Sequence, residues 1–188
     1  MLSGKLVARK ENYIIVDVSG VGYKIFISPK THEELPEINS AVKLFSYLNV
    51  KEDALDLYGF VRESDLTFFE KLITVNGVGP KSALAVMSVA PVDQLMAAIN
   101  EGKLELLTRA SGVGRRIAER LILELKGKLP ILQSAEAVEQ MESEVELEDI
   151  LVGLGYTKNA VKGILRKIDP KLIGLESRLK NALKLLKK

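Results

Sequence analysis

Residues 75–83 read VNGVGPKSA, and residues 110–118 read ASGVGRRIA. Each stretch places Gly-Val-Gly after a small polar residue and ahead of basic residues, and Gly112 follows Gly77 by 35 positions. Apolar residues recur at helical spacing on both sides of each stretch. The repeat therefore predicts two helical hairpins of one design.

A glycine turn of this kind has a mechanical use ahead of a helix. Glycine tolerates a positive φ and close approach, the valine can pack between the two helices, and the next helix presents unpaired N–H groups at its start. Such donors suit an anion, and Lys81, Arg115 and Arg116 add positive charge beside them. Phosphate is the expected ligand, gripped through the main chain without regard to base sequence.

Two other glycine motifs do not fit these letters. A P-loop requires G-x-x-x-x-G-K-[ST], and GVGPKS lacks the second glycine. A Rossmann fingerprint requires a preceding strand and a small residue close to where Ile117 stands. Ordinary glycine C-caps in a helix bundle remain the alternative, although two copies, each followed by basic residues, favour phosphate.

Composition narrows the class of protein. The chain has 188 residues, 47% of them hydrophobic, with no cysteine and a single histidine, His32. A disulfide framework, a thiolate metal site and a histidine cluster are therefore excluded, and a reducing compartment fits. Since no run approaches the roughly 20 apolar residues that span a bilayer, we expect a soluble, cytosolic protein with no membrane partner.

The net charge of +2 hides a segregation along the chain. Residues 129–150 carry seven acidic and no basic residues, whereas residues 151–188 carry ten basic and two acidic ones. An acidic block between segments of different character is typical of a solvated tether. The chain is therefore expected to have three parts.

Hydrophobic periodicity gives each part a fold. Residues 1–62 hold short β-like runs separated by glycine turns, which predicts a small antiparallel barrel of the OB type, with an unrelated β-meander as the alternative. Residues 64–128 show four or five short helical patterns. Three more follow from about Glu146, enough for a minimal bundle.

The ordered set of motifs resembles one family. NGVGPKSA and SGVGRRIAERLILELK resemble tandem helix-hairpin-helix motifs, and the whole chain resembles RuvA, the family of bacterial subunits that bind Holliday junctions. MLSGKL, VSGVGYKIFIS, YLNVKEDALDLYGF and the LGY near residue 155 extend the resemblance over nearly all the chain. It implies a multidomain α+β fold, namely an OB-fold domain with an acidic pin (1–63), a tandem helix-hairpin-helix domain (64–130), a flexible acidic linker (131–145) and a three-helix, UBA-like bundle (146–188).

The resemblance also implies a function. It is that of a non-catalytic DNA-binding scaffold, without metal or cofactor, which holds a four-way Holliday junction open and planar as a homotetramer or, with two tetramers, an octamer. The last domain would recruit the hexameric RuvB ATPase for branch migration in recombination and DNA repair. The RuvC resolvase would join a larger complex, in the bacterial cytoplasm and as part of the SOS response to DNA damage.

By position, the resemblance assigns roles to three sets of residues. The DNA-binding set is Asn76, Gly77, Val78, Gly79, Lys81 and Ser82, then Ser111, Gly112, Val113, Gly114, Arg115 and Arg116, with serine at 111 where many hairpins have proline. The acidic pin is Glu52 and Asp53, whose carboxylates would repel phosphates at the crossover. The motor-binding set is Leu151, Leu154, Tyr156 and Leu183.

Each of these roles has an alternative interpretation. Without the resemblance, the sequence around Glu52 and Asp53 indicates only a solvent-exposed turn. Likewise, Leu151, Leu154 and Tyr156 suit the core of the bundle as well as a partner-binding surface. A helix-hairpin-helix nuclease or glycosylase is disfavoured, because the paired acids lack a third metal ligand and no aspartate follows the second turn. A general duplex-binding adaptor remains open, and the basic excess of the tail has no assignment.

Overall fold

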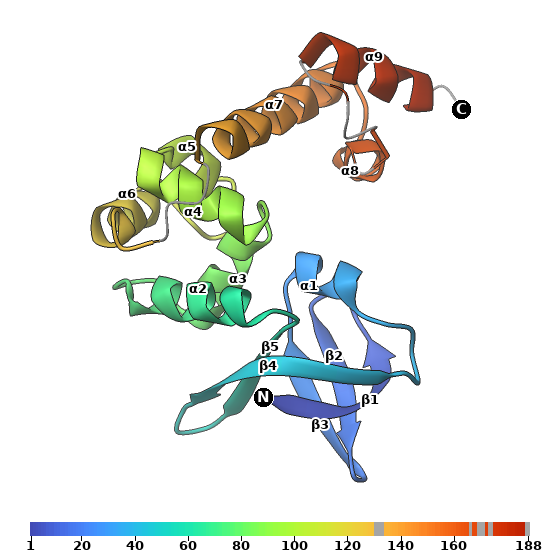
Figure 1. Cartoon of the computed structure of the whole chain (residues 1–188), viewed down its shortest axis with the longest axis vertical. Coiled ribbons are helices and arrows are strands. Elements are labelled where there is room, and N and C mark those ends of the chain that lie inside the picture. Colours follow the sequence, from blue (N-terminus) through green and yellow to red (C-terminus); the bar gives the residue numbers. More distant parts are fainter. Residues whose placement is uncertain (130–133, 166, 169–171, 173–174, 187–188) are drawn as a thin grey trace. The chain divides into compact units, whose positions relative to one another are not determined.

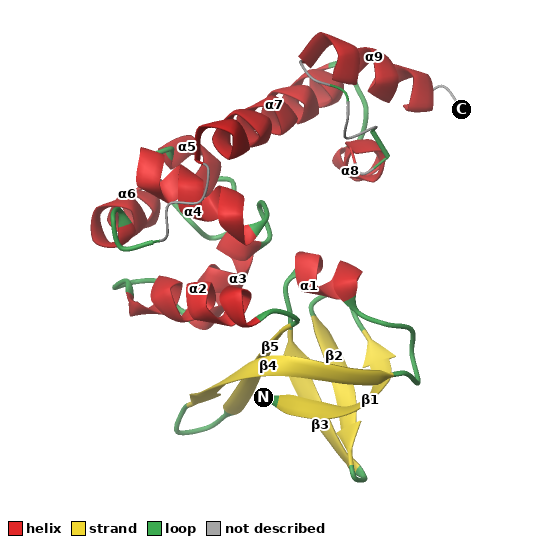
Figure 2. Ribbon diagram, viewed as in Figure 1, coloured by secondary structure: helices red, strands yellow, loops and turns green. Residues whose placement is uncertain are grey.

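The structure is a computed structural model that describes residues 1–129, 134–165, 167–168, 172 and 175–186 (Figure 1). Within the segment 134–142 it describes the backbone but not the side chains. The chain divides into two compact units, residues 1–132 and residues 133–188. In the described chain, strands lie within residues 2–60 with one short helix among them, and the regular structure after residue 60 is helical (Figure 2).

The first sixty residues form a closed five-stranded barrel with the strand order β1-β2-β3-β5-β4. Neighbouring strands are antiparallel except for the parallel pair β3 and β5. The strands are β1 (Leu2–Arg9), β2 (Tyr13–Val18), β3 (Val21–Phe26), β4 (Ala41–Val50) and β5 (Leu55–Phe60). The expected OB-like barrel is confirmed, but the expectation that all its strand pairs are antiparallel is wrong at the β3–β5 pair.

Alternation along the strands fills the barrel. On β2, Ile14 and Val16 are fully buried and Ile15 between them is half-buried, as the two-residue period of a strand requires, and Ile25 of β3 adds a third fully buried side chain. The tight β2–β3 connection uses Gly20 at φ +89°, and the Gly20 N–H donates to Asp17 Oδ1 at 2.8 Å. Glycine suits this left-handed position, which a side chain would strain.

A short helix, α1 (Pro29–Glu34), was not expected from the sequence. It begins at Pro29, directly after Ser28, whose hydroxyl accepts the Thr31 N–H at 3.1 Å. Arg9 ties the helix to the barrel by donating to the His32 carbonyl at 2.6 Å. Six residues are too few to show helical periodicity, but the Ser-Pro pair is a recognisable start signal.

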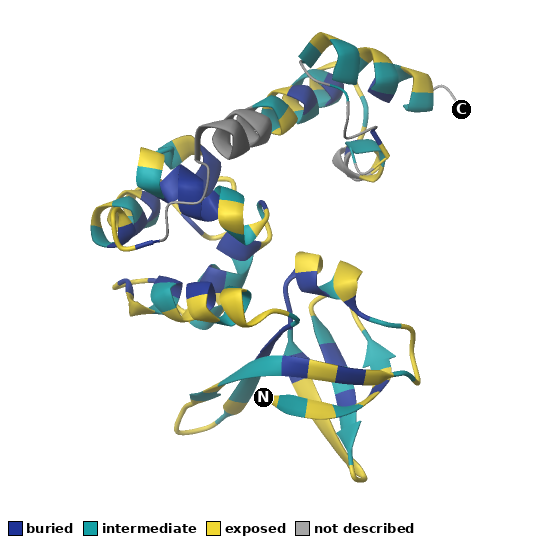
Figure 3. Cartoon of the chain, in the orientation of Figure 1, coloured by how far each residue is buried: buried dark blue, intermediate teal, exposed yellow. Residues whose placement is uncertain are grey.

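Five helices complete the first unit, in agreement with the four or five expected. They are α2 (Glu63–Thr74), α3 (Pro80–Met87), α4 (Val92–Glu101), α5 (Leu104–Leu107) and α6 (Arg115–Leu125). Helix α4 is largely buried (Figure 3). Every residue from Leu95 to Ile99 is less than a tenth exposed. The predicted hairpins are α2 with α3 and α5 with α6.

An aromatic cluster joins the barrel to the first hairpin. The Phe69 ring of α2 is fully buried, and its centroid lies 4.9 Å from Phe60, 5.5 Å from Tyr58 and 5.4 Å from Tyr47. Offset and edge-on ring pairs add to the burial of their apolar surface. Only residues 61–62 separate β5 from α2, so the barrel and the first hairpin helix are directly packed.

The first turn of α2 carries a half-buried carboxyl group, that of Asp65. Burial raises the pKa of Asp65 above its ordinary value; the Arg62 guanidinium opposes this shift, and the Glu34 carboxylate adds to it. Arg62 itself pairs with Glu34 at 2.9 Å, which links the start of α2 to α1. The charged form of Asp65 is therefore disfavoured at the junction of barrel and helices.

The second unit consists, in its described part, of α7 (Ser134–Gly153), α8 (Lys158–Leu165) and α9 (Leu175–Leu186). Its core is small and consists of Leu147, Leu151, Val161, Ile168 and Ala182. No single described helix is long and apolar enough to cross a membrane; α3 and α4 together reach the length and composition, but they are bent by 99°.

The acidic stretch differs from its expected irregular conformation. Helix α7 begins at Ser134 and so covers most of the predicted linker, residues 131–145, of which 131–133 lie outside the described residues. Glutamate and alanine are good helix formers, and acidic composition alone does not prevent a helix. Arg178 of α9 also pairs with Glu144 at 3.2 Å, which fixes this part of α7 on the bundle. The limits of the linker remain a prediction.

Candidate nucleic-acid interface

The first turn connects α2 to α3 through residues 75–79. Gly77 adopts φ +89°, the Val78 N–H donates to the Val75 carbonyl at 3.0 Å, and Gly79 is extended at φ −85° and ψ 172°. Pro80 then begins α3 with its φ already suited to a helix. The turn is thus a tight, internally bonded bend that delivers the chain into a new helix.

The second turn repeats this geometry through residues 110–114. Gly112 adopts φ +76°, the Val113 N–H donates to the Ala110 carbonyl at 3.0 Å, and Gly114 is extended at φ −79° and ψ 170° before α6. Each bond and dihedral of the first turn has its counterpart here. The prediction of two hairpins of one design is confirmed.

The predicted DNA-binding set divides into buried and exposed members. Val78 and Val113 are 5% and 4% exposed, as expected for residues that pack between the paired helices. Ser82 is half-buried, and the remaining members are exposed, namely Asn76, Gly77, Gly79, Lys81, Ser111, Gly112, Gly114, Arg115 and Arg116. The valines therefore hold the turns together, while their neighbours form the accessible surface.

Both helix starts lack a side-chain cap. The first helical bond is Ala83 N–H to the Gly79 carbonyl in α3, and in α6 both the Ile117 and Ala118 N–H groups donate to the Gly114 carbonyl. The N–H groups ahead of these have no intrahelical acceptor, because a helix cannot supply one in its first turn. Together with the helix dipole, they make each start a place for an anion.

Glycine at 79 and 114 is not required by the fold. Both backbones lie in an extended region that any residue adopts, and a Cβ built at either position meets no atom within 4 Å. A serine or aspartate there would cap the helix better than glycine does. The choice of glycine keeps the helix start open and uncovered, which is useful only toward something outside the chain.

Basic side chains surround the two turns. Lys81 follows the first turn and Arg115 and Arg116 follow the second, all exposed. One nitrogen of Arg115 forms an ion pair with Glu119, with Nε 2.9 Å from Oε1. The excess of cations near uncapped helix starts suits phosphate, although such exposed pairs contribute little to stability.

Sequence reasoning missed Arg120. This exposed residue of α6 donates from Nη1 to the Asn76 carbonyl at 2.9 Å, so a side chain of the second hairpin reaches the first turn. Arg116 and Arg120 are four residues apart and therefore share one face of the helix. That spacing could have indicated a shared basic face, but only the structure shows that the Arg120 guanidinium lies at the Asn76 carbonyl.

The predicted acidic pin lies at the tip of the β4–β5 hairpin, in residues 51–54. The Lys51 N–H donates to the Ala54 carbonyl at 2.9 Å, and Glu52 and Asp53 between them are exposed. Lys51 also pairs with Asp56 at 3.2 Å. The hairpin-tip placement is confirmed, and the lysine at the base of the tip is paired with Asp56 and not with the two acids.

The predicted motor-binding residues do not share one environment. Leu151 is fully buried in the core of the second unit, so its expected exposure is not found. Tyr156 and Leu183 are half-buried and pack against that core, whereas Leu154 is 59% exposed beside Gly155, which adopts φ +95°. Leu154 is the member best placed to meet a partner, and the role of the set stays a prediction.

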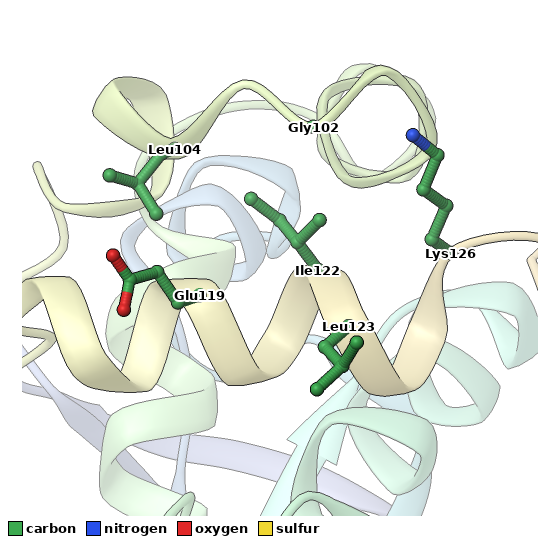
Figure 4. A pocket seen from close by; sticks show the side chains of 6 residues that line it. All are labelled: Gly102, Leu104, Glu119, Ile122, Leu123 and Lys126. Atoms are coloured by element: carbon green, nitrogen blue, oxygen red, sulfur yellow. The ribbon is translucent and has the colours of Figure 1, made fainter.

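A shallow groove of about 480 Å³ lies along α6, on the side of Glu119 and Lys126 (Figure 4). Ile122 and Leu123 of α6 and Leu104 of α5 provide its apolar lining, and Leu123 is 82% exposed. The sequence patterns did not single out this surface. Among the described residues, no group of three or more histidine or acidic side chains is arranged to hold a metal ion.

A barrel followed by two matched hairpins defines the class of tandem helix-hairpin-helix proteins, and comparison with known proteins agrees. A family model described as "RuvA N terminal domain" matches residues 1–59, and one described as "SAM-like Helix-hairpin-helix tandem" matches residues 69–128. With relatives that are 35–41% identical over at least 94% of the chain, these matches show that the chain belongs to the RuvA family.

Similar proteins cover almost the whole chain. The relative from Caldanaerobacter subterraneus subsp. tengcongensis is 41% identical over 94% of this chain and 92% of its own length. That from Clostridium botulinum is 37% identical over 100% and 98%, and that from Actinobacillus pleuropneumoniae serotype 7 is 35% identical over 97% and 96%. Each is named "Holliday junction branch migration complex subunit RuvA".

Proposed function

We propose that this chain is a non-catalytic DNA-binding subunit that recognises four-way Holliday junctions for branch migration in recombination and repair. Membership of the RuvA family supports the proposal, because its relatives are named as subunits of a Holliday junction branch migration complex. The paired turns support it independently, since two uncapped helix starts with the same turn geometry on one domain suit successive phosphates of a DNA arm.

The observation that carries the proposal is the pair of uncapped helix starts behind Gly79 and Gly114. In each, main-chain N–H groups and flanking cations would bind phosphate oxygens, while the absent Cβ leaves room for close approach. Since these contacts read no base edges, binding would tolerate any sequence and depend strongly on salt.

The pin would act by repulsion. Exposed carboxylates at Glu52 and Asp53, repeated in each copy of a fourfold assembly, would gather negative charge at the centre of the junction. Phosphates are repelled by such charge, most strongly at low salt. The pin would therefore hold the crossover open and guide separating strands without cutting them.

Self-association is the second element of the proposal, as a homotetramer or, on DNA, an octamer. Apolar side chains on the β4–β5 hairpin support it, because Val50 and Leu55 form a cross-strand pair and are 68% and 70% exposed. Exposed apolar residues grouped in this way favour burial against another protein surface. Sedimentation velocity of the purified chain measures the number of copies.

The remaining partners follow from the family. The second unit would recruit the RuvB ATPase through the surface at Leu154, Tyr156 and Leu183, in the domain predicted at residues 146–188. RuvC would join the larger complex, and the assembly would work in the bacterial cytoplasm. A chain truncated after the first unit should keep its DNA affinity and lose its stimulation of the motor; retained stimulation would place the motor contact elsewhere.

The test of the proposed function compares a labelled four-way junction with one of its linear arms. We expect clear preference for the junction, and weaker binding by Gly79→Ala and Gly114→Ala, whose Cβ atoms meet nothing in the chain and so leave the fold intact. Equal affinity for both DNAs would indicate a general duplex-binding adaptor. Cleavage of the junction by the protein and Mg²⁺ alone would indicate a nuclease.

A further inference from the structure

Arg120 is part of α6 in the second hairpin, but its guanidinium contacts the first turn. It is the sixth residue of α6, and its Nη1 atom donates to the Asn76 carbonyl at 2.9 Å. The place of a Cβ on Gly77 lies 3.8 Å from the same nitrogen. The guanidinium therefore lies against the backbone of the turn that precedes α3.

The contact leaves most of the guanidinium available. Arginine carries five N–H donors in a fixed planar fork, and among the described residues the Asn76 carbonyl is its one hydrogen-bond partner here. The side chain is exposed, so the other donors face solvent at the edge of the turn. A planar fork anchored at one corner is well suited to a phosphate at another.

We propose that Arg120 completes the phosphate site of the first turn from the second hairpin, by bridging the Asn76 carbonyl and a bound phosphate. This rests on the proposed function, because it assumes a phosphate at the start of α3. The first hairpin alone supplies one side-chain cation, Lys81, to that site, whereas the second has Arg115 and Arg116. Arg120 would give the first site a second side-chain cation, and its bond to the Asn76 carbonyl would hold the two turns at a fixed distance.

The experiment measures the dissociation constant of a fluorescent four-way junction and its dependence on salt concentration. Arg120→Ala should weaken binding about tenfold and reduce the salt slope by about one per lost phosphate contact, while the melting temperature falls by at most a few degrees, because only one exposed hydrogen bond is lost. Arg120→Lys keeps the charge but not the fork, so it should remain at least about fivefold weak. Lys126→Ala, which removes an exposed cation at the end of α6, should change binding less than about twofold.

Double variants locate the effect. With Gly79→Ala, the loss from Arg120→Ala should be much smaller than in the wild type, because both changes damage one site; with Gly114→Ala the two losses should multiply. Independent losses with Gly79→Ala, full rescue by lysine, or an equal loss in Lys126→Ala would each overturn the bridge. If Gly79→Ala itself binds normally, the proposed turn site fails; if only Arg120→Ala binds normally, the bridge alone fails.

Discussion

Replacing Gly79 by aspartate should make the protein more stable and a weaker DNA binder at once. The extended backbone at this position is that of an ordinary N-cap, and the new Cβ meets no atom within 4 Å. An aspartate there accepts N–H groups of the first turn of α3 and complements the helix dipole, which should add about 0.5–1 kcal/mol to the free energy of unfolding.

The same carboxylate would occupy the donors on which the proposed phosphate depends. Two unit charges about 5 Å apart repel by about 1 to 3 kcal/mol, for effective dielectric constants from bulk water down to about 20. Junction affinity should therefore fall about 5- to 150-fold, with the largest effect at low salt. Gly114→Asp should behave in the same way at the second turn.

Thermal unfolding followed by circular dichroism and anisotropy titration of a labelled junction measure the two effects. Gly79→Ser separates capping from charge, since it adds the acceptor alone, and Asn12→Asp adds the same charge on an exposed barrel loop. We expect an intermediate loss of affinity from the serine and almost none from the loop aspartate. A stabilised Gly79→Asp protein that binds the junction normally would refute phosphate binding at the start of α3.

Other predictions concern the barrel and its pin. Phe69→Ala should lower the free energy of unfolding by about 3–5 kcal/mol in urea titrations, because a fully buried ring is lost from an aromatic cluster; a loss below about 1 kcal/mol would show that the cluster does not hold barrel and helices together. Asp65→Asn should raise the melting temperature at neutral pH, and this advantage should shrink as the pH falls through the raised pKa of Asp65 toward 3.8, since protonation relieves the wild type; a gap that is constant with pH would contradict the burial effect. Glu52→Gln with Asp53→Asn should leave junction affinity equal or higher while altering motor-driven branch migration, and weaker binding would contradict repulsion by the pin.

The barrel and the hairpins were predictable because local patterns carry them. Alternation around Ile14 and Val16 indicates a strand with one buried face, and the repeated Gly-Val-Gly gives both turns their φ values and their buried valines. Helix α1 escaped because six residues show no period. The helix that covers the acidic stretch escaped because charge pattern predicts solvation but does not distinguish a solvated helix from an irregular tether.

The candidate site was predictable as a set of letters but not as an arrangement. The repeated Gly-Val-Gly motif identified the glycines and basic residues of both turns from the sequence. Arg120, in contrast, contacts Asn76 across 44 positions, and no local pattern encodes such a contact. Leu151 and Leu154 look alike in the sequence, yet one is fully buried and the other is 59% exposed. Which apolar residue of a small bundle faces outward depends on how its helices pack.

The direct passage from β5 into α2 has a geometric consequence. Asp53 at the tip of the pin and Gly77 in the first turn belong to one unbroken run of chain, which the rings around Phe69 brace at its middle. In the assembly and DNA complex proposed above, the distance from the pin carboxylates to each bound DNA arm would then be set inside every subunit, before any contact between subunits forms. Adjusting that distance would require remodelling the aromatic brace and not the surfaces where copies meet.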